Sequence, residues 1–88
     1  MGYRILLYPK ANAFLKSAEG DTRNRIIEKL HILDSNPEKG EKLKYSDFWR
    51  LRIGDHRAIY EIDYSNKQVI VLFIGHRKDV YDDFSKLF

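Results

Sequence analysis

"FWRLRIGDHRAIYEID", residues 48–63, reads as two strands joined by a tight turn at Gly-Asp-His. In its first half, the apolar residues Trp49, Leu51 and Ile53 alternate with a second set that includes Arg50 and Arg52. Strand residues two apart point to the same face, so one face of this hairpin is apolar and the other carries the arginines. The stretch therefore predicts an antiparallel hairpin with one buried face and one cationic face.

The sequence after the hairpin extends it into a sheet. The run "QVIVLFIG" (68–75) follows a turn at "YSNK" and is apolar at successive positions. We expect Val69, Val71 and Phe73 on one face and Ile70, Leu72 and Ile74 on the other, which is typical of a strand in the interior of a sheet. With the hairpin, this strand predicts a three-stranded antiparallel meander.

The first half of the chain predicts a strand and two helices. "YRILLYP" (3–9) has the β-branched and aromatic character of a strand that ends at Pro9. Apolar residues recur at helical spacing over 10–18, and again in a second helix for which Asp21 is the expected N-cap. The apolar stripes of these two helices are Ala11, Phe14, Leu15 and Ala18, and Ile26, Ile27, Leu30 and Leu33.

The end of the chain completes the expected fold. "RKDVYDDFSKLF" (77–88) has a helical stripe of Val80, Tyr81, Phe84 and Leu87. We therefore expect a single domain over 1–88 of the α+β class. It consists of an N-terminal strand, a helical hairpin, a three-stranded antiparallel meander that completes a four-stranded sheet, and a short C-terminal helix.

Composition excludes several classes of protein. With 88 residues, 43% of them hydrophobic and 33% charged, the chain has the composition of an ordinary globular domain. No apolar run is long enough to span a membrane, so no membrane association is expected. The chain contains no cysteine, which excludes disulfides and thiol chemistry and suits a cytoplasmic location.

Basic residues gather in and beside the predicted meander. The net charge is only +3, but residues 42–57 hold five basic residues against two acidic ones. Arg50 and Arg52 lie on the first strand, Arg57 begins the second, and Arg77 follows the third. Neighbouring strands are about 5 Å apart, so the four guanidinium groups are expected to converge on one face. The simpler alternative is that these arginines are only solvated.

Several arginines with a nearby aromatic ring favour an RNA site. The guanidinium fork matches phosphate oxygens two at a time and keeps its charge at biological pH. Tyr81 follows Arg77 by four residues and could stack on a base, although a core position on the last helix is an equal alternative. Further expected RNA contacts are Lys42, Lys44 and Lys78.

The sequence also resembles a known family of toxins. The pattern W-R-L-R-x-G-x-x-R-x-x-Y, which begins at residue 49, and the later G-H-R-K-x-V-Y (75–81) are similar to the RelE/ParE superfamily of type II toxin–antitoxin modules. The resemblance covers the whole chain. It implies two possible activities on one fold: ribosome-dependent endoribonucleases that cut mRNA in the RelE branch, or gyrase inhibitors in the ParE branch. A binding protein without catalytic activity is a third possibility.

The resemblance to the RelE branch implies roles for individual residues. Its basic and aromatic positions fall on Arg50, Arg52, Arg57, Arg77 and Tyr81. Cleavage would then be attack of the RNA 2′-hydroxyl on the adjacent phosphate, which needs a base, cations for the developing charge, and an acid. We expect this endoribonuclease activity to inhibit translation, with a gyrase inhibitor as the alternative.

The base for such a reaction is not evident in the sequence. The best-known members carry lysines where Arg50 and Arg52 stand, and an arginine cannot readily accept a proton. His76 is a candidate because imidazole titrates near neutrality, although its ring could equally face solvent, and His56 is a weaker candidate. No metal or cofactor is expected, since His31, His56 and His76 are scattered.

The resemblance implies partners as well. A toxin of this kind is held silent by a cognate RelB-like antitoxin, and its targets are the ribosome and mRNA. We expect the antitoxin to cover the arginine face with an amphipathic helix and acidic residues.

Overall fold

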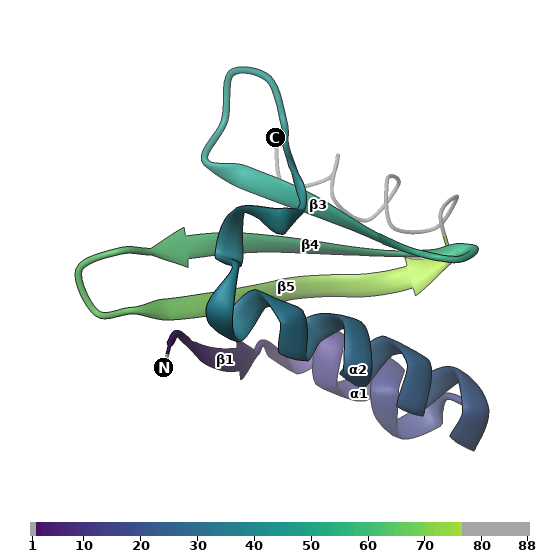
Figure 1. Cartoon of the computed structure of the whole chain (residues 1–88). Helices are drawn as coiled ribbons and strands as arrows, with labels where there is room; N and C mark the ends of the chain where they lie inside the picture. Colours follow the sequence, from purple (N-terminus) through teal and green to yellow (C-terminus); the bar gives the residue numbers. More distant parts are fainter. Residues whose placement is uncertain (1, 77–88) are drawn as a thin grey trace.

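The computed structural model describes residues 2–76, which form two helices packed on one mixed sheet (Figure 1). In chain order the elements are β1 (Arg4–Leu7), α1 (Pro9–Ser17), α2 (Gly20–Ser35), the 3₁₀ helix η1 (Pro37–Lys39), β2 (Glu41–Lys42), β3 (Phe48–Ile53), β4 (His56–Asp63) and β5 (Gln68–His76). The predicted C-terminal helix, with Val80, Tyr81, Phe84 and Leu87, lies outside the described residues.

The sheet has five strands in the order β1-β5-β4-β3-β2. The meander β3–β4–β5 is antiparallel as predicted, and β1 pairs with β5 in parallel. β5 therefore has a hydrogen-bonded neighbour on each side, which confirms that it is an interior strand. Both helices cover the same face of the sheet and leave the other face, called here the open face, without a helix among residues 2–76 (Figure 1).

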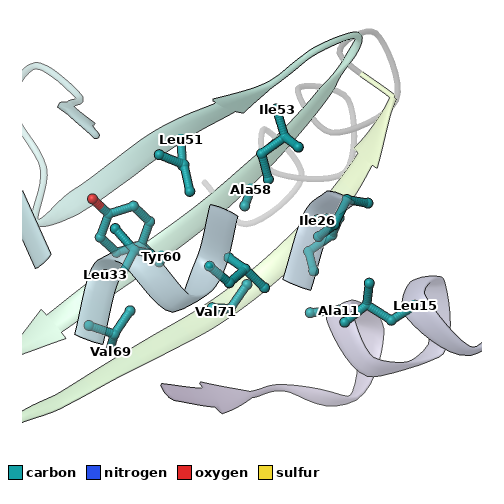
Figure 2. Packing of buried hydrophobic residues seen from close by; sticks show 12 residues of the cluster. Ala11, Leu15, Ile26, Leu33, Leu51, Ile53, Ala58, Tyr60, Val69 and Val71 are labelled. Atoms are coloured by element: carbon teal, nitrogen blue, oxygen red, sulfur yellow. The ribbon is translucent and has the colours of Figure 1, made fainter. Parts of the chain in front are cut away.

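The core lies between the helices and the sheet. Figure 2 shows Ala11 and Leu15 of α1 and Ile26 and Leu33 of α2 pointing toward side chains of β3, β4 and β5. The predicted stripe of α2 is correct at Ile26, Leu30 and Leu33, but Ile27 is 37% exposed at the edge of the stripe. The alternation read in β3 is also correct, because Leu51 and Ile53 are buried on the helix-covered face.

The turn between the helices differs from the prediction. α2 begins at Gly20 with Glu19 as its N-cap, so Asp21 lies inside the first turn rather than capping it. The side chain of Arg23 reaches back and donates hydrogen bonds to the carbonyl oxygens of Leu15, Lys16 and Ala18 at the end of α1. These bonds give donors to carbonyls at the end of α1, where the Leu15 oxygen also accepts the N–H of Ala18, and they tie the two helices together.

The sheet differs from the prediction in two places. The four predicted strands are joined by a fifth, β2, which has two residues and no apolar alternation and pairs with β3 at the edge. A register shift between Ile59 and Tyr60 pairs them with Phe73 and Val71 of β5 and leaves Leu72 as the extra residue of a bulge. Beyond the bulge the side chains of β5 point to the opposite faces from those that simple alternation predicts. Ile74 therefore joins the main core, and Phe73 packs on the open face.

Candidate functional site

Arginines of β3 and β4 meet on the open face. Arg52 lies directly opposite Arg57, and Arg50 lies two residues along β3 on the same face. The strand alternation that buries Leu51 and Ile53 against the helices turns Arg50 and Arg52 the other way. The structure thus brings together three of the four arginines predicted to converge, while Arg77 lies outside the described residues.

Arg57 is the most buried of the three. Only 8% of the residue is exposed, and it is the buried charged residue of the described part of the chain. Within residues 2–76 its buried Nε has no hydrogen-bond partner and its guanidinium has no ion pair. Burying a cation without a hydrogen-bonded anion costs free energy. An anionic ligand bound to the Arg57 guanidinium would offset this cost.

A carboxylate joins the arginine face from the edge strand. Glu41 of β2 pairs in register with Arg50 of β3, and the Glu41 carboxylate forms an ion pair with the Arg50 guanidinium. The hydrogen bond from Arg50 is the main cause that lowers the pKa of Glu41, and the charges of Arg50, Arg52 and Arg57 lower it further. Glu41 is therefore ionised at neutral pH and lies within electrostatic reach of all three arginines. We call these four residues the arginine site.

A cleft of about 250 Å³ opens beside the ion pair. Its lining residues are Lys39, Gly40, Glu41, Arg50, Leu51 and Arg52. The cleft therefore combines three cations with one carboxylate. Neither Lys39 nor Glu41 was expected from the sequence, because both lie within the helix-breaking segment 34–41 and come to the site only where β2 pairs with β3.

Lys42 and Lys44, two of the predicted lysine contacts, do not line this cleft. Lys42 lies opposite Trp49, so it faces the helix-covered side of the sheet rather than the arginines. Lys44 lies in the loop before β3, with its Nζ 5.8 Å from the ring centre of the exposed Tyr45. Lys78 and Tyr81 lie outside the described residues.

His76 is not brought together with the arginines. It pairs in register with His56, and the two imidazole rings are 5.9 Å apart. His56 in turn contacts the ring of Phe14 on α1 at 5.6 Å, which places both histidines on the helix-covered face. His56 and His76 are thus neighbours rather than scattered, while residues 2–76 hold no cluster of three or more metal-ligating side chains.

An apolar groove of about 390 Å³ lies between the start of α1 and the open face. It is lined by Tyr8, Pro9, Lys10, Phe48, Glu61, Leu72 and Phe73. Phe48 shares a face with Arg50, so the groove continues the surface that carries the arginine site. The open face therefore offers a cationic part and an apolar part side by side.

Comparison with known proteins identifies the class of this chain. Residues 5–81 match the family described as "ParE toxin of type II toxin-antitoxin system, parDE". The chain therefore belongs to the ParE toxin family, within the RelE/ParE superfamily, and is a toxin of a type II toxin–antitoxin system. No protein of curated function matches it.

No helix in the described part of the chain is long and apolar enough to cross a membrane.

Solved structures of RelE toxins share the fold. The chain is 29% identical to a chain of the archaeal RelE–RelB complex from Pyrococcus horikoshii, with a TM-score of 0.75 over 88% of this chain and 97% of that one. For the RelB–RelE complex of Methanococcus jannaschii the identity is 26% and the TM-score 0.68, over 90% and 98%. A free mutant of Escherichia coli RelE, 20% identical, has a TM-score of 0.79 over 100% and 99% and shows the shared fold.

Proposed function

We propose that this toxin is a metal-independent endoribonuclease that cleaves ribosome-bound mRNA and so inhibits translation. The observation that carries the proposal is the arginine site, and above all Arg57, which is nearly buried without a hydrogen-bonded anion in residues 2–76. A phosphodiester would supply the missing negative charge. Arg57 and Arg52 face each other across β3 and β4, so one phosphate can contact both.

The chemistry assigned to the site is an internal phosphoryl transfer. The 2′-hydroxyl of the RNA gives up its proton to a base and its oxygen attacks the adjacent phosphorus. The bond to the 5′-oxygen breaks, and this oxygen takes a proton from solvent, so the products carry a 2′,3′-cyclic phosphate and a 5′-hydroxyl. Arg52 and Arg57 stabilise the negative charge that develops on the phosphate oxygens. On sequence grounds, the proposal adds Arg77 as a further cation and Tyr81 as a stacking residue.

Glu41 is the residue we assign to accept the 2′-hydroxyl proton. It is the carboxylate of the arginine site, it is ionised, and solvent reaches it. Arg50 and Arg52 cannot take this role because a guanidinium does not give up its proton at biological pH. His76 faces the helix-covered side with His56, so the proposal gives it no proton transfer.

A gyrase inhibitor on the same fold is the second candidate. The match to the ParE toxin family over residues 5–81 favours it, since the sequence resemblance links the ParE branch to gyrase. Such an inhibitor would need the arginine site for contact but not for bond cleavage. The two candidates therefore differ in whether a covalent bond of RNA is broken.

We further propose that an antitoxin covers the open face. The similar chains of Pyrococcus horikoshii and Methanococcus jannaschii were solved as complexes with RelB antitoxins. The apolar groove at Phe48 and Phe73 beside three arginines fits an amphipathic segment that carries acidic residues.

Two parallel assays test the proposal. Purified toxin is added to ribosomes programmed with a defined mRNA, and separately to gyrase with relaxed plasmid. We expect cleavage of the message and unchanged supercoiling, with cleavage slowed about 10²–10³-fold in Arg57→Gln, the loss typical of removing one charge-stabilising donor. Loss of supercoiling with an intact message would instead favour the gyrase inhibitor.

A further inference from the structure

The ion pair of Glu41 and Arg50 lies at the position where an anionic ligand would contact the arginine site. Glu41 reaches Arg50 because β2 and β3 pair at these two residues, so the backbone brings the two side chains together. The side chain of Arg50 is 19% exposed and that of Glu41 is 66% exposed. A ligand can therefore approach the pair from solvent.

The segment before Glu41 is fixed on the sheet by a buried tyrosine. The hydroxyl of Tyr60 donates a hydrogen bond to the carbonyl oxygen of Pro37 at 2.7 Å and accepts one from the N–H of Gly40 at 3.1 Å. A Cβ at Gly40 would lie 2.6 Å both from that hydroxyl and from the carbonyl oxygen of Arg50, so only glycine fits this close approach. The position of Glu41 beside Arg50 is thus built into the fold.

The pair has an electrostatic consequence for any ligand. Its carboxylate offers Arg50 the same kind of acceptor that a phosphate offers, and it also lies within reach of the charges of Arg52 and Arg57. A phosphate that binds at these arginines must therefore compete with Glu41 for Arg50. Both anions cannot take the same guanidinium edge, and two negative groups in contact repel each other.

We propose that the Glu41–Arg50 pair is a latch that closes the arginine site in the free toxin and that an RNA phosphate opens by taking Arg50 from Glu41. Only the catalytic benefit of opening rests on the proposed ribonuclease function; the competition itself does not. Once Arg50 has turned to the phosphate, the carboxylate loses its hydrogen bond and gains a negative neighbour.

Opening the latch changes Glu41 as a base. The hydrogen bond and charge of Arg50 hold the pKa of Glu41 below its usual range in the free toxin. Replacing that cation by a phosphate acts in the opposite direction and raises this pKa. A carboxylate of higher pKa accepts a proton more readily, so the substrate itself converts Glu41 into a stronger base. The toxin would then be activated at the moment when its substrate is in place.

Binding of an uncleavable probe tests the competition. The probe is a single-stranded hexadeoxynucleotide, which has phosphates but no 2′-hydroxyl to attack. Glu41→Gln removes the competing charge. Glu61→Gln is the matched control, because Glu61 of β4 also lies on the open face of the sheet but has no ion pair within residues 2–76. We expect Glu41→Gln to bind the probe about three- to fivefold more tightly than the wild type, the range of one surface ion pair. The control should change affinity less than 1.5-fold. Equal affinities of the two variants would overturn the latch.

The carboxyl carbon of Glu41, followed by NMR titration, gives a second and independent reading. We expect its titration midpoint to rise when the probe saturates the protein, and inorganic sulfate to act in the same direction. An unchanged midpoint with bound probe, or no binding of either anion, would overturn the proposal. Neither experiment involves a ribosome or RNA cleavage. A working latch in a toxin that leaves ribosome-bound message intact would therefore overturn the ribonuclease function and not the latch.

Discussion

Replacing Tyr60 by phenylalanine should destabilise the toxin and loosen the edge of the sheet that carries Glu41. Tyr60 is fully buried, and its hydroxyl bonds both to the Pro37 carbonyl oxygen and to the Gly40 N–H. Its burial also raises the pKa of the phenol, so the hydroxyl keeps its proton at neutral pH and can donate. Tyr60→Phe removes both hydrogen bonds and leaves the ring in place.

The size of the effect follows from these two bonds. A hydrogen bond contributes about 1 kcal/mol net, so losing two costs about 2 kcal/mol in the free energy of unfolding. In a chain of this length that corresponds to a fall of about 8–16 °C in Tm. Urea unfolding followed by circular dichroism measures the free energy, and calorimetry measures Tm.

A second tyrosine of the same region provides the control. Tyr64 is 54% exposed, and its hydroxyl donates to Glu38 Oε2 at 2.6 Å, an interaction that raises the pKa of Tyr64 to about 12. Water can replace this exposed bond, so Tyr64→Phe should lower the free energy of unfolding by less than about 0.5 kcal/mol. A Tyr60→Phe protein that melts within about 2 °C of the wild type, or no lower than Tyr64→Phe, would refute the reasoning.

Three further predictions concern the arginine site. Because the pKa of Glu41 is lowered, its ionised carboxylate stabilises the folded toxin above the usual titration range of a carboxyl group, and this contribution is lost as the pH falls through the lowered pKa. Arg50→Gln should raise the titration midpoint of the Glu41 carboxyl, read by NMR, and an unchanged midpoint would contradict the ion pair. Gly40→Ala should lower Tm, because the added methyl group meets the Arg50 carbonyl oxygen and the Tyr60 hydroxyl, and a wild-type Tm would contradict the close approach. Arg52→Gln should weaken binding of the hexadeoxynucleotide and reduce its salt dependence by about one phosphate contact, whereas an unchanged salt slope would place Arg52 outside the site.

Much of the sheet was predictable because period-two alternation is local. The alternation of Trp49, Leu51 and Ile53 predicted which face of β3 is apolar. It also predicted that Arg50 and Arg52 point together to the other face. Alternation failed in β5, where the bulge at Leu72 moves Phe73 to the open face. A bulge depends on how a strand pairs with its neighbour, so nothing within β5 itself revealed it.

The acidic member of the site was missed for a related reason. Glu41 lies in a two-residue strand without apolar periodicity, and its ion pair exists only through the register of β2 on β3. The contact between His56 and His76 likewise arises from the pairing of β4 with β5. Sequence patterns thus identified the cations and their common face, while the pairing of strands determined which other groups lie beside them.

The most direct measurement is the chemistry of the ends that the toxin leaves on mRNA. Ribosomes programmed with a defined message are treated with wild-type toxin or Arg57→Gln, and the chemical ends of the resulting fragments are analysed. The proposed ribonuclease function predicts fragments with a 2′,3′-cyclic phosphate and a 5′-hydroxyl, strongly reduced in a folded Arg57→Gln protein. An intact message with wild-type toxin, or ends carrying a 5′-phosphate, would contradict it.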